Sequence, residues 1–229
     1  MTYGIIAALD EELSPLLREC CIEQEKEIYG TKIYKGSIHG QSVVLCKCGI
    51  ATINAALCTS VVIREFGADC IINTGIAGAL GEGVRMLDVV ISTDACYYNR
   101  DAALMEKYYP FTNCFKADDS LVRRAALAAG KVQLHGSPVR VHQGRIVTGD
   151  LFVADRALKE ELISRFHPLC VEMEGAAIAN TAFACGRPFV IVRTMSDCAD
   201  EEANENYDRL IEDAGSLSAS IILKMLEEE

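Results

Sequence analysis

The chain has 229 residues and a formal net charge of −11, and 50% of its residues are hydrophobic. This composition supports a sizeable core and excludes general disorder, while the negative charge argues against a nucleic-acid-binding protein, which needs a concentrated basic surface. No apolar run reaches the ~18–20 residues that cross a bilayer, and no basic stretch precedes an apolar one at the N-terminus, so we expect neither a membrane span nor a signal peptide.

The predicted elements alternate between apolar strands and helices along the whole chain. In the first half we expect, in order, a strand at 3–8, a helix at 10–18, antiparallel strands within 27–47, a helix at 51–66, a strand with a glycine turn at 70–78, and a strand at 86–96. A long irregular loop is expected from Tyr97 to Phe115. The second half predicts a helix at 117–129, a strand at 140–148, a helix at 155–166, a strand at 169–171, a helix at 173–185, a strand at 188–195 and a closing helix at 204–226.

This alternation, without a linker or a repeat, predicts the α/β class. We expect a single domain over residues 1–229, with a mixed, mostly parallel central sheet flanked by helices.

The 11 cysteines are expected to be reduced thiols of a cytoplasmic protein. Their number is odd, and several lie inside apolar segments, where a free cysteine behaves as a small hydrophobic residue. Cys46 and Cys48 alternate as on one face of a strand and have no second pair at the spacing of a zinc site. We therefore expect no metal.

Three acidic clusters follow apolar strands: Asp10 to Glu12, then Glu172 with Glu174, then Asp197. Because ligands collect at the carboxyl ends of parallel strands, we expect these carboxylates to form one site. Asp197 follows its strand without turn residues, so it is held near the core, where a carboxyl group can act as a general acid. Glu172 and Glu174 are two residues apart and cannot share a helix face, so one should point outward or to a partner and the other toward the strand ends.

Several runs of residues resemble the nucleoside phosphorylase superfamily, and within it the bacterial 5′-methylthioadenosine/S-adenosylhomocysteine nucleosidases. The strongest are Val171–Ala177 and Arg193–Asp197. The likeness extends from residue 3 to about 226 and includes Gly4–Glu12, Cys48–Ile50, Ile72–Gly75, Phe115–Asp119 and Thr148–Val153.

The resemblance implies a hydrolase that cleaves the N-glycosidic bond of methylthioadenosine and of S-adenosylhomocysteine, giving adenine and the thioribose. In this scheme Asp197 protonates the purine at N7, Glu12 deprotonates the attacking water and Glu174 binds the ribose hydroxyls. The paired acid and base match the chemistry of glycoside hydrolysis. The other implied substrate contacts are Leu9, Ile50, Gly78, Phe152, Val153, Met173, Ser196 and Tyr207.

The resemblance further implies no metal or organic cofactor, and a homodimer in which the partner's loop from about Tyr97 to Phe115 closes the pocket. Two departures from the family pattern matter. Ile76 stands where the family has a serine that positions the catalytic acid, so we expect backbone or water to orient Asp197. The loop also differs from the family's His-Asp-rich version, which leaves the preferred 5′ substituent open.

Three other functions remain open at this point. A phosphorylase on the same fold needs a cationic phosphate site, for which Arg85 and Arg193 are the only candidates. A related nucleosidase could act on aminofutalosine or another 5′-modified adenine nucleoside. A non-enzymatic nucleoside-binding protein would use the acids for ligand contact alone.

Overall fold

The computed structural model describes residues 1–197 and 207–227, without the side chains of 207–209. Its main sheet contains β1 (Thr2–Ala7), β2 (Cys21–Ile28), β3 (Thr31–Ile38), β4 (Gln41–Lys47), β5 (Cys70–Ala79), β6 (Val89–Tyr97), β7 (Cys114–Lys116), β10 (Val141–Thr148), β11 (Cys170–Glu172) and β12 (Phe189–Asp197). A separate small hairpin consists of β8 (Gln133–Leu134) and β9 (Ser137–Pro138). The helices are α1 (Asp10–Glu19), α2 (Thr52–Arg64), α3 (Ala102–Lys107), α4 (Asp119–Ala129), α5 (Arg156–Phe166), α6 (Gly175–Ala184) and α7 (Tyr207–Glu227).

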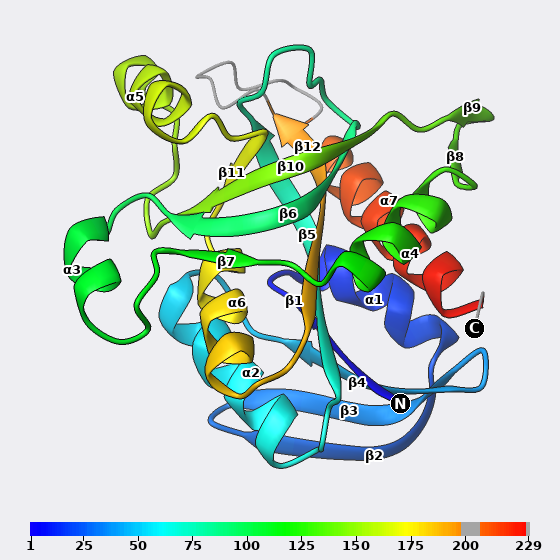
Figure 1. Ribbon diagram of the computed structural model, residues 1–229. Helices are drawn as coiled ribbons and strands as arrows, with labels where there is room; N and C mark the ends of the chain where they lie inside the picture. Colours follow the sequence, from blue (N-terminus) through cyan, green and yellow to red (C-terminus); the bar gives the residue numbers. More distant parts are fainter. Residues whose placement is uncertain (198–206, 228–229) are drawn as a thin grey trace.

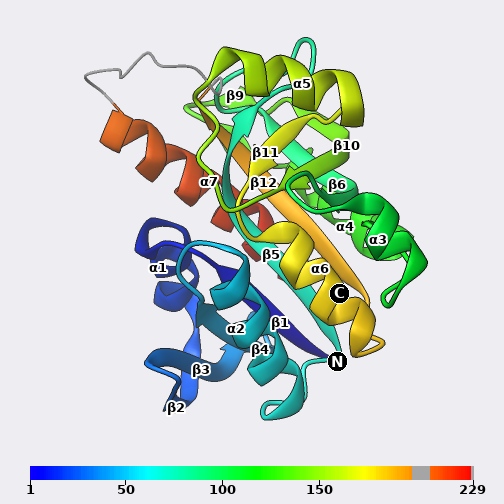
Figure 2. The ribbon, with the colours of Figure 1, turned by 90° about the vertical axis from the view of Figure 1, so that its left-hand side faces the viewer.

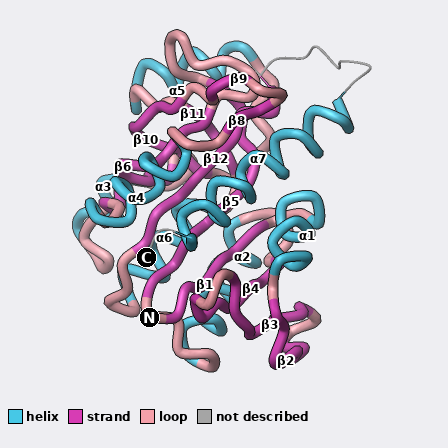
Figure 3. The backbone as a smooth tube through the Cα atoms, turned by 90° about the vertical axis from the view of Figure 1, so that its right-hand side faces the viewer, coloured by secondary structure: helices cyan, strands magenta, loops and turns pink. Residues whose placement is uncertain are grey.

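The main sheet is mixed, and its central strands are mostly parallel. The strand order is β11-β10-β6-β12-β5-β1-β4-β3-β2. β1 runs parallel to β4 and β5, β12 runs parallel to β5, and β10 runs parallel to β6 and β11. Because β11 also pairs with β5, the strands β5, β12, β6, β10 and β11 close into a ring, and Figure 3 shows them side by side.

Helices cover the sheet on both sides, which confirms the predicted α/β class. α2 and α6 pack together on one side, while α7 packs against α1 and α4 on the other (Figure 1). α5 lies apart from both groups, above the end of the ring that includes β11 (Figure 2). None of the described helices is long and apolar enough to cross a membrane.

The core lies between the sheet and its helices. The strands at the centre of the sheet carry almost no exposed residues, since both of their faces are covered. Ile71, Ile72, Val190 and Val192, for example, are completely buried. The central strands are therefore rigid supports for the residues at their ends.

The predicted glycine turn at 75–78 is wrong, because β5 continues as a strand to Ala79 and pairs with β12 along this stretch. Gly75 serves a different purpose there. A Cβ atom at this position would lie 2.4 Å from a guanidinium nitrogen of Arg193 and 2.5 Å from Oε1 of Glu12. Glycine thus leaves room for two buried charged side chains to meet beside the strand.

The segment from Tyr97 to Phe115 is not wholly irregular as predicted. It contains the short helix α3, capped by the Asp101 carboxylate, which accepts the Leu104 N–H at 3.0 Å. It ends in β7, which pairs antiparallel with β6. The prediction failed because a six-residue helix and a three-residue strand are too short to show a period.

The prediction that every cysteine is reduced is also wrong. Cys96 on β6 and Cys114 on β7 stand directly opposite each other and form a disulfide. Sequence alone did not suggest this pair, because the short strand β7 that aligns them was not recognised. Among the described residues, Cys20, Cys21, Cys46, Cys48, Cys58, Cys170 and Cys185 are free thiols.

Candidate active site

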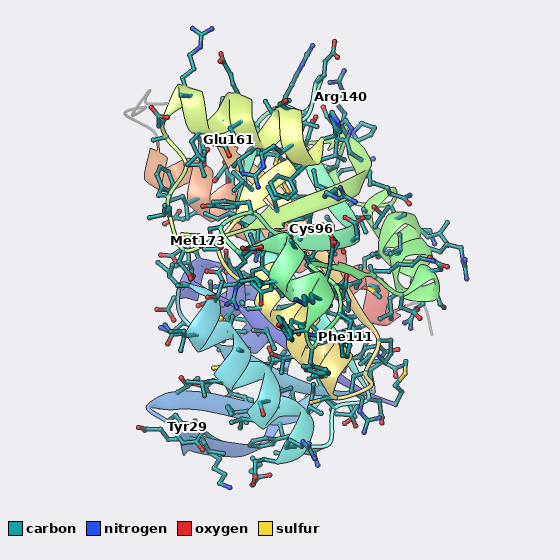
Figure 4. All side chains as sticks on the ribbon, turned by 60° about the vertical axis from the view of Figure 1, so that its left-hand side comes forward. Tyr29, Cys96, Phe111, Arg140, Glu161 and Met173 are labelled. Atoms are coloured by element: carbon teal, nitrogen blue, oxygen red, sulfur yellow. A yellow bond between two sulfur atoms is a disulfide. The ribbon has the colours of Figure 1, made fainter. Side chains whose placement is uncertain are left out.

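One cavity of about 250 Å³ lies at the carboxyl ends of the parallel strands. Its lining comes from the residues that follow β1, β4, β10 and β11, from the last residues of β5, β11 and β12, and from Ile211 of α7. Figure 4 shows Met173, which lines the cavity, between α2 and the part of the molecule that carries α5. The expected meeting of the three acidic clusters therefore occurs, since Glu12, Glu174 and Asp197 all line this cavity.

The other predicted site residues lie around the same cavity, with one exception. They are Leu9, Ile50, Gly78, Phe152, Val153, Met173 and Ser196. Tyr207 is the first residue of α7, but its side chain lies outside the described residues.

The carboxylate of Glu12 is buried and held by three backbone donors. Oε2 accepts the N–H groups of Ala8 at 2.7 Å and Leu9 at 3.0 Å, and Oε1 accepts the Ile76 N–H at 2.9 Å. Burial raises the pKa of Glu12, whereas the nearby Arg193 charge and these N–H donors oppose the rise. The backbone N–H groups of loop 8–9 and of β5 thus fix the orientation of the Glu12 carboxylate.

Arg193 is the centre of a buried charge network. Its guanidinium donates to Asn73 Oδ1 at 2.7 Å and to the Ile76 carbonyl at 3.2 Å. It also donates to Glu172 and, at 3.3 Å, to Glu174 Oε2. Since the one buried cation faces two buried carboxylates, it compensates part of their negative charge and leaves the rest at the cavity.

The expectation that one of Glu172 and Glu174 points to a partner while the other faces the strand ends is confirmed only in part, because Glu172 contacts Arg193 and Thr148 but both residues line the cavity. It assumed that both residues belong to a helix. Glu172 is the last residue of β11, and Glu174 is the N-cap residue of α6. Glu172 also accepts a hydrogen bond from Thr148 and the N–H groups of Glu174, at 3.0 Å, and Gly175, at 2.7 Å.

Glu174 combines burial with partners from distant segments. Burial raises the pKa of Glu174 to about 7, and the Arg193 charge and the Ala51 N–H oppose this rise. The Ala51 N–H donates to Glu174 Oε1 at 2.9 Å. Glu174 is therefore a carboxylate that changes charge near neutral pH at the wall of the cavity.

Asp197 is oriented by its neighbour in the chain. The Ser196 hydroxyl donates to Asp197 Oδ2 at 2.9 Å, and Ser196 is almost completely buried. The register of β12 against β5 shifts between Met195 and Asp197, so Ser196 is the extra residue of a β-bulge. The expectation that only backbone or water orients Asp197 is therefore incomplete, because a serine does supply a hydrogen bond, from a different position.

The opposite wall of the cavity is apolar and open. Ile50 and Phe152 both line the cavity, yet 52% and 65% of these residues are exposed. Apolar side chains at a cavity mouth are suited to contact a ligand or another protein surface.

Some lining residues were not assigned to the site from the sequence. They are Ala8, Ala77, Leu151, Val171 and Ile211, which carry no chemical signature. Glu172 and Arg193 also line the cavity, and their mutual contact could have been suspected from two charged residues at the ends of apolar strands.

The fold and the carboxylate-lined cavity at its strand ends are those of one protein family, which comparison with known proteins identifies. The family model described as "Phosphorylase superfamily" matches residues 2–227, and the chain belongs to this family. Within it, the chain is similar to the 5′-methylthioadenosine/S-adenosylhomocysteine nucleosidase of Halalkalibacterium halodurans, with 38% identity over 227 residues, covering 97% of this chain and 96% of the relative.

Solved structures agree with this placement. The nucleosidase of the same kind from Neisseria meningitidis, in complex with methylthio-immucillin-A, has a TM-score of 0.91 and 35% identity, covering 100% of this chain and 99% of that one. The futalosine hydrolase of Helicobacter pylori strain 26695 has a TM-score of 0.89 at 28% identity, covering 100% of this chain and 98% of that one.

Proposed function

We propose that this protein hydrolyses the N-glycosidic bond of 5′-methylthioadenosine and of S-adenosylhomocysteine, releasing adenine and the corresponding thioribose. The cavity geometry and the similarity to enzymes of this name support the proposal. As the resemblance implies, we expect the reaction to need no metal or organic cofactor.

The charge of the cavity wall is the observation that carries hydrolysis rather than phosphorolysis. Arg193 is the only basic side chain among the described residues that line the cavity, and it is committed to Glu172, Glu174 and Asn73. The other candidate, Arg85, lies on the exposed surface outside the lining. A phosphate dianion would meet carboxylates there without a free cation, whereas a neutral water molecule would not be repelled.

The chemistry divides between two carboxyl groups. Asp197 donates a proton to N7 of the purine, so that adenine leaves as a neutral base. Glu12 orients the water and accepts its proton, a role suited to a carboxylate that backbone donors keep in place. This is the acid-and-base pairing of glycoside hydrolysis, and Glu174 adds negative charge near the developing oxocarbenium ion.

Substrate recognition follows from the remaining lining residues. Glu174 accepts the ribose hydroxyls, with Met173 against the sugar. Phe152 stacks on the purine while the Val153 backbone bonds its edge, and Gly78 offers its N–H to the ligand. Leu9 and Ile50 line the pocket around the sugar and the 5′ substituent. Ser196, first expected to bind substrate, is better assigned to holding Asp197.

One product analysis tests whether the reaction is hydrolysis or phosphorolysis. Methylthioadenosine is incubated with the protein with and without phosphate, and the sugar product is identified by mass spectrometry. We expect free methylthioribose in both cases. A strict requirement for phosphate, with a sugar phosphate as product, would refute hydrolysis. A parallel incubation with aminofutalosine tests the related nucleosidase activity. The similarity of the chain to a futalosine hydrolase is the reason for including this substrate.

We further propose a homodimer formed through the face that carries α2, α6 and α3 (Figure 2). This face exposes large apolar side chains from several segments, and Figure 4 shows one of them, Phe111. The exposed residues of these segments are Ile53 and Leu57 on α2, Leu104 on α3, Phe183 on α6, Tyr108, Tyr109 and Phe111 just after α3, and the cavity-lining Ile50, Leu151 and Phe152. In the dimer, the partner's segment 97–115 would cover the open mouth of the cavity.

Light scattering tests the dimer. We expect a particle of twice the chain mass of 24.9 kDa. Ile53→Glu, at a residue that is 74% exposed on α2, should give the single-chain mass. Leu127→Glu is the matched control, because Leu127 is 64% exposed on α4, across the sheet. A single-chain mass for the wild type, or an unchanged mass for Ile53→Glu, would count against this interface.

Two further expectations stay proposals. A single nucleoside phosphorylase-like domain over residues 1–229 is supported by the family match over residues 2–227. A cytoplasmic location is supported by the free thiols of Cys20, Cys21, Cys46, Cys48, Cys58, Cys170 and Cys185, whereas the disulfide between Cys96 and Cys114 counts against it.

A further inference from the structure

The first turn of α2 has an unusual beginning. Its N-cap residue, Ala51, has φ 84° and ψ 161° and offers no side-chain cap. This region of backbone space is populated almost only by glycine, so a residue with a Cβ atom stays there only when surrounding contacts enforce it. Something outside the helix must therefore hold the turn.

Asp150, which is 98 residues from Thr52 in the sequence, holds the first turn of α2. Its Oδ1 accepts the Thr52 N–H at 2.8 Å, and its Oδ2 accepts the Thr52 hydroxyl at 2.8 Å. Both carboxylate oxygens are thus used on the first residue of α2, which is buried. The negative charge also lies at the positive end of the helix dipole.

The turn that carries Asp150 is itself fixed. Tyr98 packs against Gly149 so closely that a Cβ atom there would lie 2.3 Å from its ring. The Tyr98 hydroxyl donates to the Leu151 carbonyl at 2.9 Å. Asp150 therefore stands between two residues whose backbone is held by the same tyrosine.

The strained residue points its N–H at the active site. Ala51 donates to Glu174 Oε1 at 2.9 Å, and Ile50, just before it, lines the cavity. On the other side, the cavity-lining segment Leu151 to Val153 directly follows Asp150. The hydrogen bonds from Thr52 to Asp150 thus connect two parts of the site. One is the segment Leu151 to Val153, which we expect to contact the purine, and the other is Ala51, whose N–H donates to Glu174.

We propose that Asp150 is a positioning residue for the nucleosidase reaction. It holds the first turn of α2 so that the Ala51 N–H stays directed at Glu174. This role rests on the proposed function. Asp150 is not among the residues that line the cavity, and its hydrogen bonds to Thr52 explain why a residue with a Cβ atom can keep the Ala51 conformation.

Substitutions at Asp150 separate its hydrogen bonds from its charge. Asp150→Ala removes both acceptors, whereas Asp150→Asn can still accept the Thr52 N–H and donate to the Thr52 hydroxyl. We expect kcat/KM for methylthioadenosine to fall ~10-fold or more in Asp150→Ala, as for one lost hydrogen bond to a charged group. Asp150→Asn should keep most of the activity.

The pH profile of kcat/KM provides a readout that a merely structural role would not move. Loss of the Ala51 hydrogen bond removes an influence that lowers the pKa of Glu174, so the acid limb should move to higher pH in Asp150→Ala. The groups that face Glu174 from the surrounding elements are Arg193, Glu172, Glu12 and the Cys48 thiol, and all are unchanged in this variant.

A helix cap elsewhere gives the matched control. Asp118 accepts the N–H groups of Ser120 and Leu121 at 3.0 Å at the start of α4, outside the cavity lining. Asp118→Ala should lower the Tm while leaving the pH profile and kcat/KM unchanged. The double variant Asp150→Ala with Ala51→Gly should recover at least ~3-fold of the lost kcat/KM, because glycine adopts positive φ without strain.

If Asp150→Ala does not fold, Thr52→Val and Thr52→Ser carry the same test, since only serine keeps the hydroxyl donor. We then expect the acid limb to shift in Thr52→Val and not in Thr52→Ser. The proposal is overturned by an unshifted acid limb with wild-type kcat/KM in Asp150→Ala, or by a double variant no better than Asp150→Ala. Wild-type turnover is measured first, so an inactive wild type counts against the proposed function and not against the role of Asp150.

Discussion

Replacing Arg193 with methionine should destabilise the protein strongly, and more at high pH than at low pH. The side chain is 1% exposed and contacts two carboxylates, so its removal leaves buried negative charge without a cation. Breaking a buried ion pair by removing one partner costs about 3–5 kcal/mol. For a chain of this size about 1 kcal/mol corresponds to ~2–4 °C in Tm, so we expect a fall of about 6–20 °C at pH 8.

The pH dependence follows from the direction of the pKa shifts. Burial already raises the pKa values of Glu12 and Glu174, and loss of the Arg193 charge raises them further. A carboxyl group with a raised pKa binds more protons in the folded than in the unfolded state, so stability falls as pH rises from the unfolded to the folded pKa. The Tm deficit of Arg193→Met should therefore shrink when the pH is lowered from 8 to about 5.5, because protonation removes the uncompensated charge.

Differential scanning fluorimetry across this pH range measures both effects. Arg156→Met is the matched control, since Arg156 pairs with Glu160 on the surface of α5 with 89% of its side chain exposed. Its Tm should stay within ~2 °C of the wild type. A Tm of Arg193→Met within the same margin at pH 8 would show that the buried network does not depend on this cation.

Three further predictions concern turnover of methylthioadenosine. Asp197→Asn should lower kcat by ~10²-fold or more, as for the loss of a general acid, and near-full activity would refute its assigned role. Ser196→Ala removes the hydrogen bond to Asp197 and should lower kcat ~5- to 10-fold with little change in KM, whereas a change in KM alone would point to direct substrate binding. Glu174→Gln should lower kcat/KM and remove from the pH profile the titration that the pKa of about 7 predicts for Glu174, and an unchanged kcat/KM would contradict ribose recognition by this residue.

The site could be located from the sequence because each of its acidic residues is marked by the residues next to it in the chain. Each of Glu12, Glu174 and Asp197 follows an apolar strand within a few residues, and parallel strands bring their carboxyl ends to the same place. The periods of the longer strands and helices likewise predicted the α/β fold.

The features that were missed depend on contacts between distant segments. Arg193 meets Glu172 from another strand, and Asp150 reaches Thr52 across 98 residues. The hydrogen bond from Ser196 to Asp197 depends on a bulge whose register only the partner strand reveals. Chemistry that depends on pairing across the sheet has no signature within a single segment.

The ring formed by β5, β12, β6, β10 and β11 has a consequence for how the protein meets other copies of itself. Pairing of β11 with β5 closes the sheet at that end, so β2 is its long free edge in the described chain. An unpaired edge is a template for aggregation, which charged side chains oppose. β2 exposes Glu23, Glu25 and Glu27 against one lysine of its own, Lys26, and Glu25 pairs with Lys32 of β3, so the edge keeps a net negative charge and two such edges repel each other when these groups are ionised. The protein's resistance to aggregation should therefore weaken in acid and at high salt, where this repulsion is neutralised or screened.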